Sequence, residues 1–103
     1  MVTKTKRTVC HNTAKIKKLK KVVPSGEVLK EMAGSYKAIG HPGRFAILKI
    51  LEVEKSCVCD ISHTLEQPVS TVSQNLNILK KAGWINSKQE GKFVYYSLKK
   101  KIP

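Results

Sequence analysis

Three cysteines are the residues of this chain best suited to bind a soft ion. Cys57 and Cys59 are separated by one residue, and Cys10 lies close to the N-terminus. Their thiolates favour soft ions, here arsenite, Cd(II), Pb(II), Zn(II) or Cu(I). Residues two apart point about 200° apart on an ideal helix, but both thiolates can converge where a helix begins. Because these ions take more than two ligands, the expected site adds Cys10, with His11 as a further ligand.

Other interpretations of the same residues stay open. Cys59 and His63 are four residues apart and would share one helix face. Free cysteine is among the most buried residue types, so Cys57 or Cys59 could simply belong to the core. Accessible, reactive thiols would instead support a redox switch. An odd cysteine count argues against a disulfide framework.

A second group of residues is suited to hydrogen bonding with nucleic-acid bases and phosphates. Four aliphatic residues recur at helical spacing, and we expect them to face the core: Val69, Val72, Leu76 and Leu79. The opposite side and the flanks carry uncharged polar side chains: Ser70, Thr71, Ser73, Gln74, Asn75 and Asn77. Solvated helix faces usually carry charged residues, since these favour helix, so this composition indicates a helix that reads DNA. Ile78 is the exception, and we expect it to pack on a neighbouring element.

The spacing of apolar residues predicts the elements that position these groups. Four helices and then two strands are expected, over residues 25–39, 42–51, 57–65 and 69–82, then 84–89 and 92–98. Pro42 suits the first turn of the second helix, and Gly83 ends the fourth. In the first helix Leu29, Met32, Tyr36 and Ile39 mark one helical face. The residues expected to be buried in the next two helices are Phe45, Leu48 and Leu51, then Ile61 and Leu65.

Two short helices joined by a tight turn and followed by a hairpin predict a winged helix-turn-helix, a mainly α fold with a small β-hairpin. Lys88 and Lys92 flank the hairpin turn, where they would meet DNA phosphates, although lysine also protects exposed strand edges. The expected organisation has three parts: a basic, mobile or partly helical arm over 1–24, the DNA-binding domain over 25–98 and a basic tail over 99–103.

The positive charge is concentrated at the two ends of the chain. Lys and Arg number 20 against 7 Asp and Glu, a net charge of +13. Residues 1–21 hold 8 of these cations and no acid, and Lys99, Lys100 and Lys101 follow at the other end. Basic ends attract a polyanion without reading its sequence. A non-specific architectural DNA-binding protein is therefore one alternative, and solubility is the plainer explanation of the charge.

Several classes of protein are excluded by what the sequence lacks. A chain of 103 residues makes one domain. We find no Gly-rich phosphate loop, no paired acids placed for catalysis and no nucleophile beside a base, so we expect no enzyme. No apolar run approaches the roughly 18 residues of a membrane span, and no signal peptide is recognisable, so we expect a cytoplasmic protein without a membrane partner.

From about Tyr36 to Leu98 the chain resembles the ArsR/SmtB family of metal-responsive repressors. The resemblance covers about 60% of the chain. The matching segments are Ile39-Gly40-His41-Pro42-Gly43-Arg44 with Ile47-Leu48, Cys57-Val58-Cys59-Asp60-Ile61, Ser70-Thr71-Val72-Ser73-Gln74-Asn75-Leu76, Leu79-Lys80-Lys81-Ala82-Gly83, and Glu90-Gly91-Lys92-Phe93-Val94-Tyr95-Tyr96-Ser97-Leu98. It implies a homodimeric winged-helix repressor that leaves double-stranded operator DNA when an inducer binds.

The resemblance also bears on the metal site and on the dimer. Some members pair a Cys-x-Cys at this helix with an N-terminal cysteine, often from the other subunit, which implies a site at Cys57, Cys59 and Cys10. No ion is expected to be required for folding.

Many members carry His where this chain has Gln74 and Asn75. The family's long helix after the second wing strand has no counterpart before Pro103, so dimerisation is expected to use the arm and the first helix, and no interfacial metal site is expected. A thiol redox-sensing repressor is the alternative that uses the same cysteines.

Overall fold

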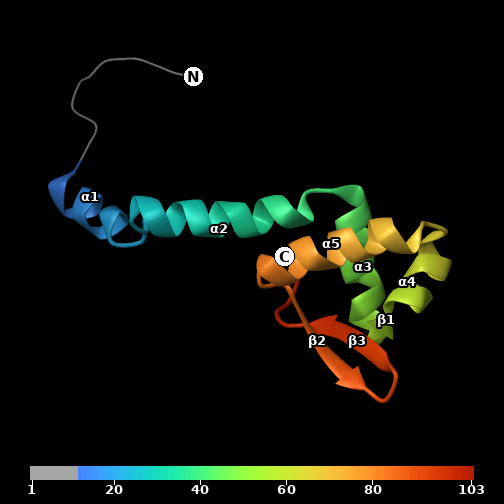
Figure 1. Ribbon diagram of the computed structural model, residues 1–103. Helices are drawn as coiled ribbons and strands as arrows, with labels where there is room; N and C mark the ends of the chain where they lie inside the picture. The colour runs from blue at the N-terminus through green and yellow to red at the C-terminus, as the bar shows by residue number, and fades with distance from the viewer. Residues whose placement is uncertain (1–11) are drawn as a thin grey trace. The chain divides into compact units, whose positions relative to one another are not determined.

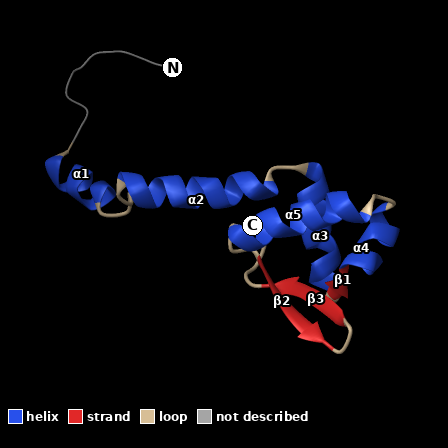
Figure 2. Ribbon diagram, in the orientation of Figure 1, coloured by secondary structure: helices blue, strands red, loops and turns tan. Residues whose placement is uncertain are grey.

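The structure is a computed structural model that describes residues 12–103. Its elements are α1 (Thr13–Lys20), α2 (Gly26–Ile39), α3 (Pro42–Val53), β1 (Ser56–Cys57), α4 (Val58–Leu65), α5 (Val69–Lys81), β2 (Ile85–Glu90) and β3 (Phe93–Leu98). The order of helices and hairpin strands agrees with the expectation, and the fold is a winged helix-turn-helix (Figures 1 and 2). The chain divides within α2 into two units, residues 1–31 and 32–103, and each is described by itself.

The described part of the first unit contains α1 and the beginning of α2. Asn12 caps α1, because its side-chain oxygen accepts hydrogen bonds from the main-chain nitrogens of Ala14 (2.9 Å) and Lys15 (3.1 Å). Every residue of α1 is exposed, and its last turn carries Lys17, Lys18 and Lys20. The basic segment is therefore helical over Thr13–Lys20.

Local sequence explains where the helices of the second unit begin and end. His41 caps α3 through Nδ1, which accepts hydrogen bonds from the main-chain nitrogens of Gly43 (3.1 Å) and Arg44 (3.4 Å). Pro42 occupies the first turn as expected, where its missing N–H costs nothing. α4 ends at Glu66, which adopts the left-handed conformation (φ 52°). Gly83 (φ 84°) ends the fourth predicted helix, since a residue without a Cβ adopts this conformation without strain.

The sheet has three antiparallel strands in the order β1-β3-β2. The hairpin pairs Ile85 with Leu98 and Glu90 with Phe93, and its turn contains Gly91 (φ 66°). β1 was not predicted from the sequence: Ser56 pairs with Tyr96 and Cys57 with Tyr95. The expected third helix accordingly begins one residue later, at Val58. A strand of two residues is too short to show alternation, so the apolar pattern could not reveal it.

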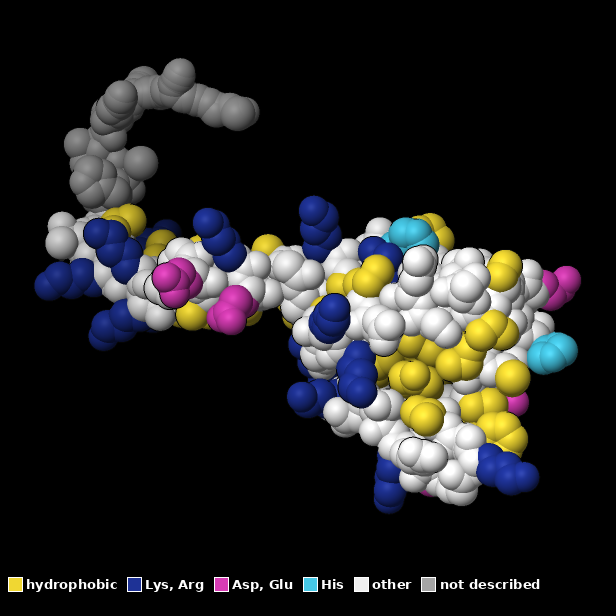
Figure 3. Space-filling model, viewed as in Figure 1, with side chains coloured by type: hydrophobic (Ala, Val, Ile, Leu, Met, Phe, Trp, Pro, Cys, Tyr) yellow, Lys and Arg dark blue, Asp and Glu magenta, His cyan; other side chains and the backbone are white. Residues whose placement is uncertain are grey.

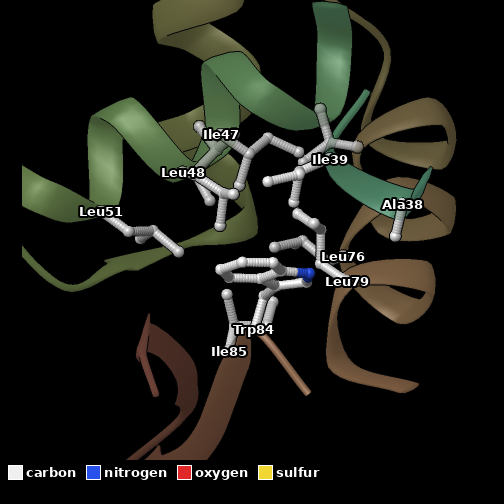
Figure 4. Close-up of a cluster of buried hydrophobic side chains, with 11 residues drawn as sticks. Ala38, Ile39, Ile47, Leu48, Leu51, Leu76, Leu79, Trp84 and Ile85 are labelled. Carbon is white, nitrogen blue, oxygen red and sulfur yellow. The ribbon is translucent and has the colours of Figure 1, made fainter. Parts of the chain in front are cut away.

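One apolar core joins the elements of the second unit. Its buried members are Ala38, Ile39, Ile47, Leu48, Leu51, Ile61, Val72, Leu76, Leu79, Trp84 and Ile85. The indole of Trp84 lies among aliphatic side chains from α3, α5 and β2 (Figure 4). Tyr96 and Leu98 of β3 pack against this core from the sheet. The core therefore packs α5 and the hairpin against the same set of side chains.

Several residues expected in the core are exposed instead. Val69 is 50% exposed, because it begins α5 before the helix reaches the core. Phe45 is exposed, since α3 buries Ile47, Leu48 and Leu51 and leaves Phe45 at the edge of that face. Along α2 only Ile39 of the expected set is buried, whereas Leu29, Met32 and Tyr36 are exposed. The apolar face predicted on this helix is therefore buried in the described part of the chain only at its C-terminal end.

The residues after β3 remain in contact with the domain. The main-chain nitrogen of Lys99 donates to the carbonyl oxygen of Trp84 (2.8 Å), and the Lys100 ammonium lies 4.2 Å from the centre of the Trp84 ring. Ile102 packs against the core. Within residues 12–103 no helix combines the length and the apolar character that crossing a membrane demands.

Candidate nucleic-acid interface and cysteine pocket

The outer face of α5 is polar, uncharged and open to solvent. Ser70, Thr71, Gln74 and Asn77 are exposed, and Ser73 is half-buried. On the opposite side Val72, Leu76 and Leu79 are fully buried. One side of α5 therefore packs on the core, and the other side presents hydroxyl and carboxamide groups to solvent. Such groups can hydrogen-bond with base edges and phosphates.

Asn75 is the one member of the predicted reading set that lies elsewhere. It is 7% exposed, and its Oδ1 accepts a hydrogen bond from Nη1 of Arg44 (3.4 Å). Arg44 also donates from Nε to the carbonyl oxygen of Ala38 (2.5 Å). A Cβ on Gly43 would lie 3.3 Å from Nδ2 of Asn75, so the two helices approach closely here. The expected surface position of Asn75 is wrong: it belongs to the contact between α3 and α5.

Ile78, the apolar exception on this helix, lies at a pocket of about 440 Å³. The pocket lies between α2, α3 and α5, and its apolar lining includes Gly34, Ala38 and Ala82. Ile78 stays 41% exposed, so it packs only partly on these neighbours. Ile78 therefore contacts neighbouring elements as expected, but these elements cover only part of its side chain.

The wing carries net positive charge at its tip. Lys88 and Lys92 are exposed on either side of the turn. The one acid there, Glu90, is paired with Lys55, whose Nζ lies 2.8 Å from Oε2. The hydrogen bond between them lowers the pKa of Glu90 and raises the pKa of Lys55, so both groups stay charged near neutral pH. Lys55 thus offsets the acid, and the two wing lysines remain available to phosphates.

Cys57 has a structural place at the junction of three elements. It is 9% exposed, it pairs with Tyr95 of the wing, and it occupies the position before the first residue of α4. Its thiol donates to Oδ2 of Asp60 (3.3 Å), and its main-chain nitrogen donates to the same oxygen (3.3 Å). Asp60 therefore holds the start of α4, a contact that the three-residue spacing of a capping box could have indicated.

Cys59 lies on the first turn of α4 and is exposed. Both cysteines line one pocket of about 280 Å³, together with Val58, Lys92, Phe93, Val94 and Tyr96. The structure thus brings two of the predicted thiol ligands to the same space beside the wing. Cys57 and Cys59 can share this pocket because the backbone is extended at Cys57 and helical at Cys59.

The remaining predicted ligands, Cys10 and His11, lie outside the described residues. His63 is exposed in the last turn of α4. Within residues 12–103 no three His, Cys, Asp or Glu side chains are grouped so that they could hold a metal ion. The described part therefore offers two soft donors, and a complete soft-ion site needs at least one more from elsewhere.

One face of the second unit, residues 32–103, combines apolar and basic side chains. Figure 3 shows exposed apolar side chains gathered on one face of this unit, with Lys and Arg side chains at the edges of that patch. The exposed apolar residues of the wing include Phe93 and Val94, which also line the cysteine pocket. This mixture suits both a polyanionic partner and a pocket with an apolar wall.

The chain is similar to known transcriptional regulators. A profile described as "Bacterial regulatory protein, arsR family" matches residues 41–87. An uncharacterized HTH-type transcriptional regulator of Methanocaldococcus jannaschii is 44% identical over 71 residues, 68% of this chain and 80% of that protein. The cadmium resistance transcriptional regulatory protein CadC of Listeria innocua is 39% identical over 69 residues, 66% of this chain but only 58% of that protein.

A solved structure shows the same fold. It is the solution structure of the homodimeric winged helix-turn-helix DNA-binding domain of a possible ArsR-family regulator from Mycobacterium bovis. The match has a TM-score of 0.69 and 27% identity, and it covers 77% of this chain and 76% of that one.

Proposed function

Because this chain belongs to the ArsR family of winged helix-turn-helix transcriptional repressors, and is not an enzyme, we propose that it reads operator DNA with α5 and the wing and releases it when a thiophilic ion binds. The proposed ion ligands are Cys57 and Cys59 with Cys10, and His11 as a further ligand. The proposed reading residues are Ser70, Thr71, Ser73, Gln74 and Asn77, with Lys88 and Lys92 on phosphates.

One observation carries the DNA-reading part: residues 70–77 of α5 present an uncharged polar face that is exposed at Ser70, Thr71, Gln74 and Asn77. Three fully buried aliphatic residues pack behind it. A helix held this firmly presents its side chains at fixed positions, which direct readout in the major groove requires. The phosphate contacts from the wing would set the register of the helix without reading bases. Asn75 is left out of the proposed face because it is buried against Arg44.

The ion-sensing part is supported by the shared pocket of Cys57 and Cys59. Thiolates are the soft donors that thiophilic ions prefer, and the pair supplies two of the ligands that such an ion takes. CadC, one of the similar proteins, is described as a cadmium resistance regulator. With Cys10 as third ligand the site would join the N-terminal segment to the start of α4, next to the helix that reads DNA.

A homodimer is part of the proposal, with α2 in its interface. Met32 is 47% and Tyr36 51% exposed on α2, and apolar side chains at this spacing form one helix face. A second copy that covers this face would bury it and place two α5 helices on one DNA site. The similar solved structure from Mycobacterium bovis is described as homodimeric.

The test of this function starts from a random pool of double-stranded DNA. Selection by the reduced full chain should enrich one sequence, and its affinity should exceed that of shuffled DNA by at least about 10³-fold at physiological salt. A salt titration on both DNAs separates phosphate attraction from base reading. A pool that yields no preferred sequence, with equal affinity for all DNA, would support the architectural alternative and contradict sequence-specific repression.

A further inference from the structure

Gly34 is a glycine that the fold of the described residues does not require. It lies inside α2, although glycine is among the poorest helix formers. Its φ is not positive, so the backbone conformation is open to any residue. A Cβ built at this position would meet no described heavy atom within 4 Å, so close packing does not exclude a side chain either. The missing side chain leaves open space beside α2.

That space is part of the pocket of about 440 Å³ between α2, α3 and α5. Small residues line it on two sides, Gly34 and Ala38 on α2 and Ala82 directly after α5. Ile78 adds a larger apolar side chain, which is 41% exposed. A concave, mostly apolar space of roughly 300–1,000 Å³ with a few polar groups is typical of a small-molecule site.

The polar groups of this pocket are all cations. Lys37, Arg44 and Lys81 line it, and no acid does. Arg44 is held in place, because its Nε donates to the carbonyl oxygen of Ala38 and its Nη1 donates to Oδ1 of Asn75. Its Nη2 has no hydrogen-bond partner within residues 12–103, and neither lysine takes part in an ion pair there. The pocket therefore combines an apolar wall with positive charge that no described acid offsets.

The position of the pocket separates it from the proposed dimer face and joins it to the proposed reading face. Met32 and Gly34 are two residues apart and point about 200° apart on α2. The apolar face of α2 and the pocket thus lie on different sides of this helix. Gln74 and Lys81 are seven residues apart, about two turns, so they project from the same side of α5. Lys81 therefore belongs both to the pocket lining and to the side of α5 proposed to read DNA.

We propose that this pocket binds a small organic carboxylate with an apolar body, and that the bound carboxylate opposes DNA binding. The apolar body fills the space beside Gly34 and contacts Ile78. The carboxylate accepts hydrogen bonds from the cations, among which a guanidinium matches its geometry. A carboxylate paired with Lys81 removes a cation that would otherwise attract DNA phosphates. The effect on DNA rests on the proposed function, whereas the binding site does not.

Binding is tested without DNA, with benzoate as the probe. Benzyl alcohol keeps the ring without the charge, and acetate keeps the charge without the ring. Each compound is titrated into the isotope-labelled full chain, and the amide chemical shifts in NMR spectra give the dissociation constants. We expect the shifts to centre on Gly34, Ala38 and Ala82. Benzoate should bind at least about 10-fold more tightly than either comparison compound, since only benzoate uses both the apolar wall and the cations.

Gly34→Leu fills the pocket and should weaken benzoate binding at least about 10-fold. Its matched control is Gly26→Leu, at the beginning of the same helix, where a Cβ also meets no heavy atom within 4 Å. This control should bind benzoate like the wild type, and circular dichroism verifies that each variant folds. Lys81→Gln is a second variant, which should weaken benzoate but not benzyl alcohol. Equal benzoate affinity for Gly34→Leu and the wild type, or equal affinity for all three compounds, would overturn the site.

The effect on DNA is measured by fluorescence anisotropy of the labelled selected DNA. Acetate at the same concentration replaces benzoate in the reference sample, so the ionic strength stays constant. Saturating benzoate should lower the DNA affinity of the wild type and of Gly26→Leu by at least about 5-fold, and leave that of Gly34→Leu unchanged. Benzoate that occupies the pocket without this loss would overturn the regulatory effect. A chain that binds benzoate but prefers no DNA sequence would contradict the proposed function and still support the binding site.

Discussion

Trp84 donates a hydrogen bond from its indole Nε1 to the main-chain carbonyl oxygen of Ser35, 2.7 Å away. The two residues lie in different elements, since Ser35 is on α2 and Trp84 follows α5. A second contact joins the same segments, because the Ser35 hydroxyl donates to the carbonyl oxygen of Ala82 (3.1 Å). The end of the helix proposed to read DNA is thus anchored to the helix proposed to form the dimer.

Trp84→Phe tests this anchor. The substitution removes the hydrogen bond and part of a fully buried side chain, so it should lower the free energy of unfolding by about 2 kcal/mol. Urea denaturation measures the change. Phe93→Leu, on an exposed wing residue, is the control and should unfold at nearly the wild-type midpoint. Equal midpoints for Trp84→Phe and the wild type would contradict the anchoring role.

Asn75→Ala tests whether Asn75 is structural. Its carboxamide accepts from Arg44 at the contact between α3 and α5. Removing it leaves a half-buried guanidinium N–H without that partner, which should cost about 1–2 kcal/mol of stability. Chemical denaturation should show the loss, and the ratio of affinities for selected and shuffled DNA should stay at the wild-type value. A variant with wild-type stability and altered base preference would instead indicate that Asn75 contacts DNA bases.

Cys57→Ser separates sensing from folding. Serine is a favoured residue before the first turn of a helix, so α4 and the DNA affinity without ion should be preserved. The weaker oxygen donor should reduce thiolate-to-cadmium absorption and abolish Cd(II)-triggered release of DNA. Anisotropy with and without Cd(II) is the measurement. If the variant releases DNA at the same Cd(II) concentration as the wild type, Cys57 is not a ligand of the sensing site.

Met32→Glu tests the proposed dimer face. A carboxylate on the exposed apolar side of α2 would have to be buried without a partner in the dimer, so the variant should be monomeric at concentrations where the wild type is dimeric. Lys30→Gln changes the net charge by the same amount on the opposite side of the helix and should remain dimeric. Sedimentation velocity measures the proportions of monomer and dimer for each variant. A wild type that is monomeric throughout, or a Met32→Glu variant that dimerises normally, would refute the interface.

The spacing of apolar residues was sufficient to predict helices α2 to α5 by their helical period, the hairpin by its alternation, and the outer face of α5 apart from Asn75. These features are local, because buried residues such as Val72, Leu76 and Leu79 repeat at the spacing of one helix face. The misplaced residues all depend on contacts made elsewhere. Val69 and Phe45 lie at the ends or edges of buried faces, where the helical spacing alone cannot say whether a neighbour reaches them.

The candidate site was predicted in part for the same reason. The polar composition of α5 and the Cys-x-Cys pair are visible in one stretch of sequence. The burial of Asn75 depends on Arg44, 31 positions away, and the pairing of Glu90 with Lys55 spans 35 positions. The proximity of Cys59 to the wing follows from β1, a strand of two residues that leaves no periodic signal. Long-range contacts of this kind are set by packing of the whole domain.

The central claim is that the exposed polar face of α5 reads bases, and Gln74→Ala tests it most directly. Gln74 is exposed on that face, so its loss should leave stability unchanged. The measurement is the ratio of dissociation constants for shuffled and selected DNA, at one salt concentration, for the variant and the wild type. A lost bidentate contact predicts that this ratio falls by about 5- to 150-fold, through weaker binding of the selected DNA alone. Equal weakening on both DNAs, or no weakening at all, would contradict base reading by α5.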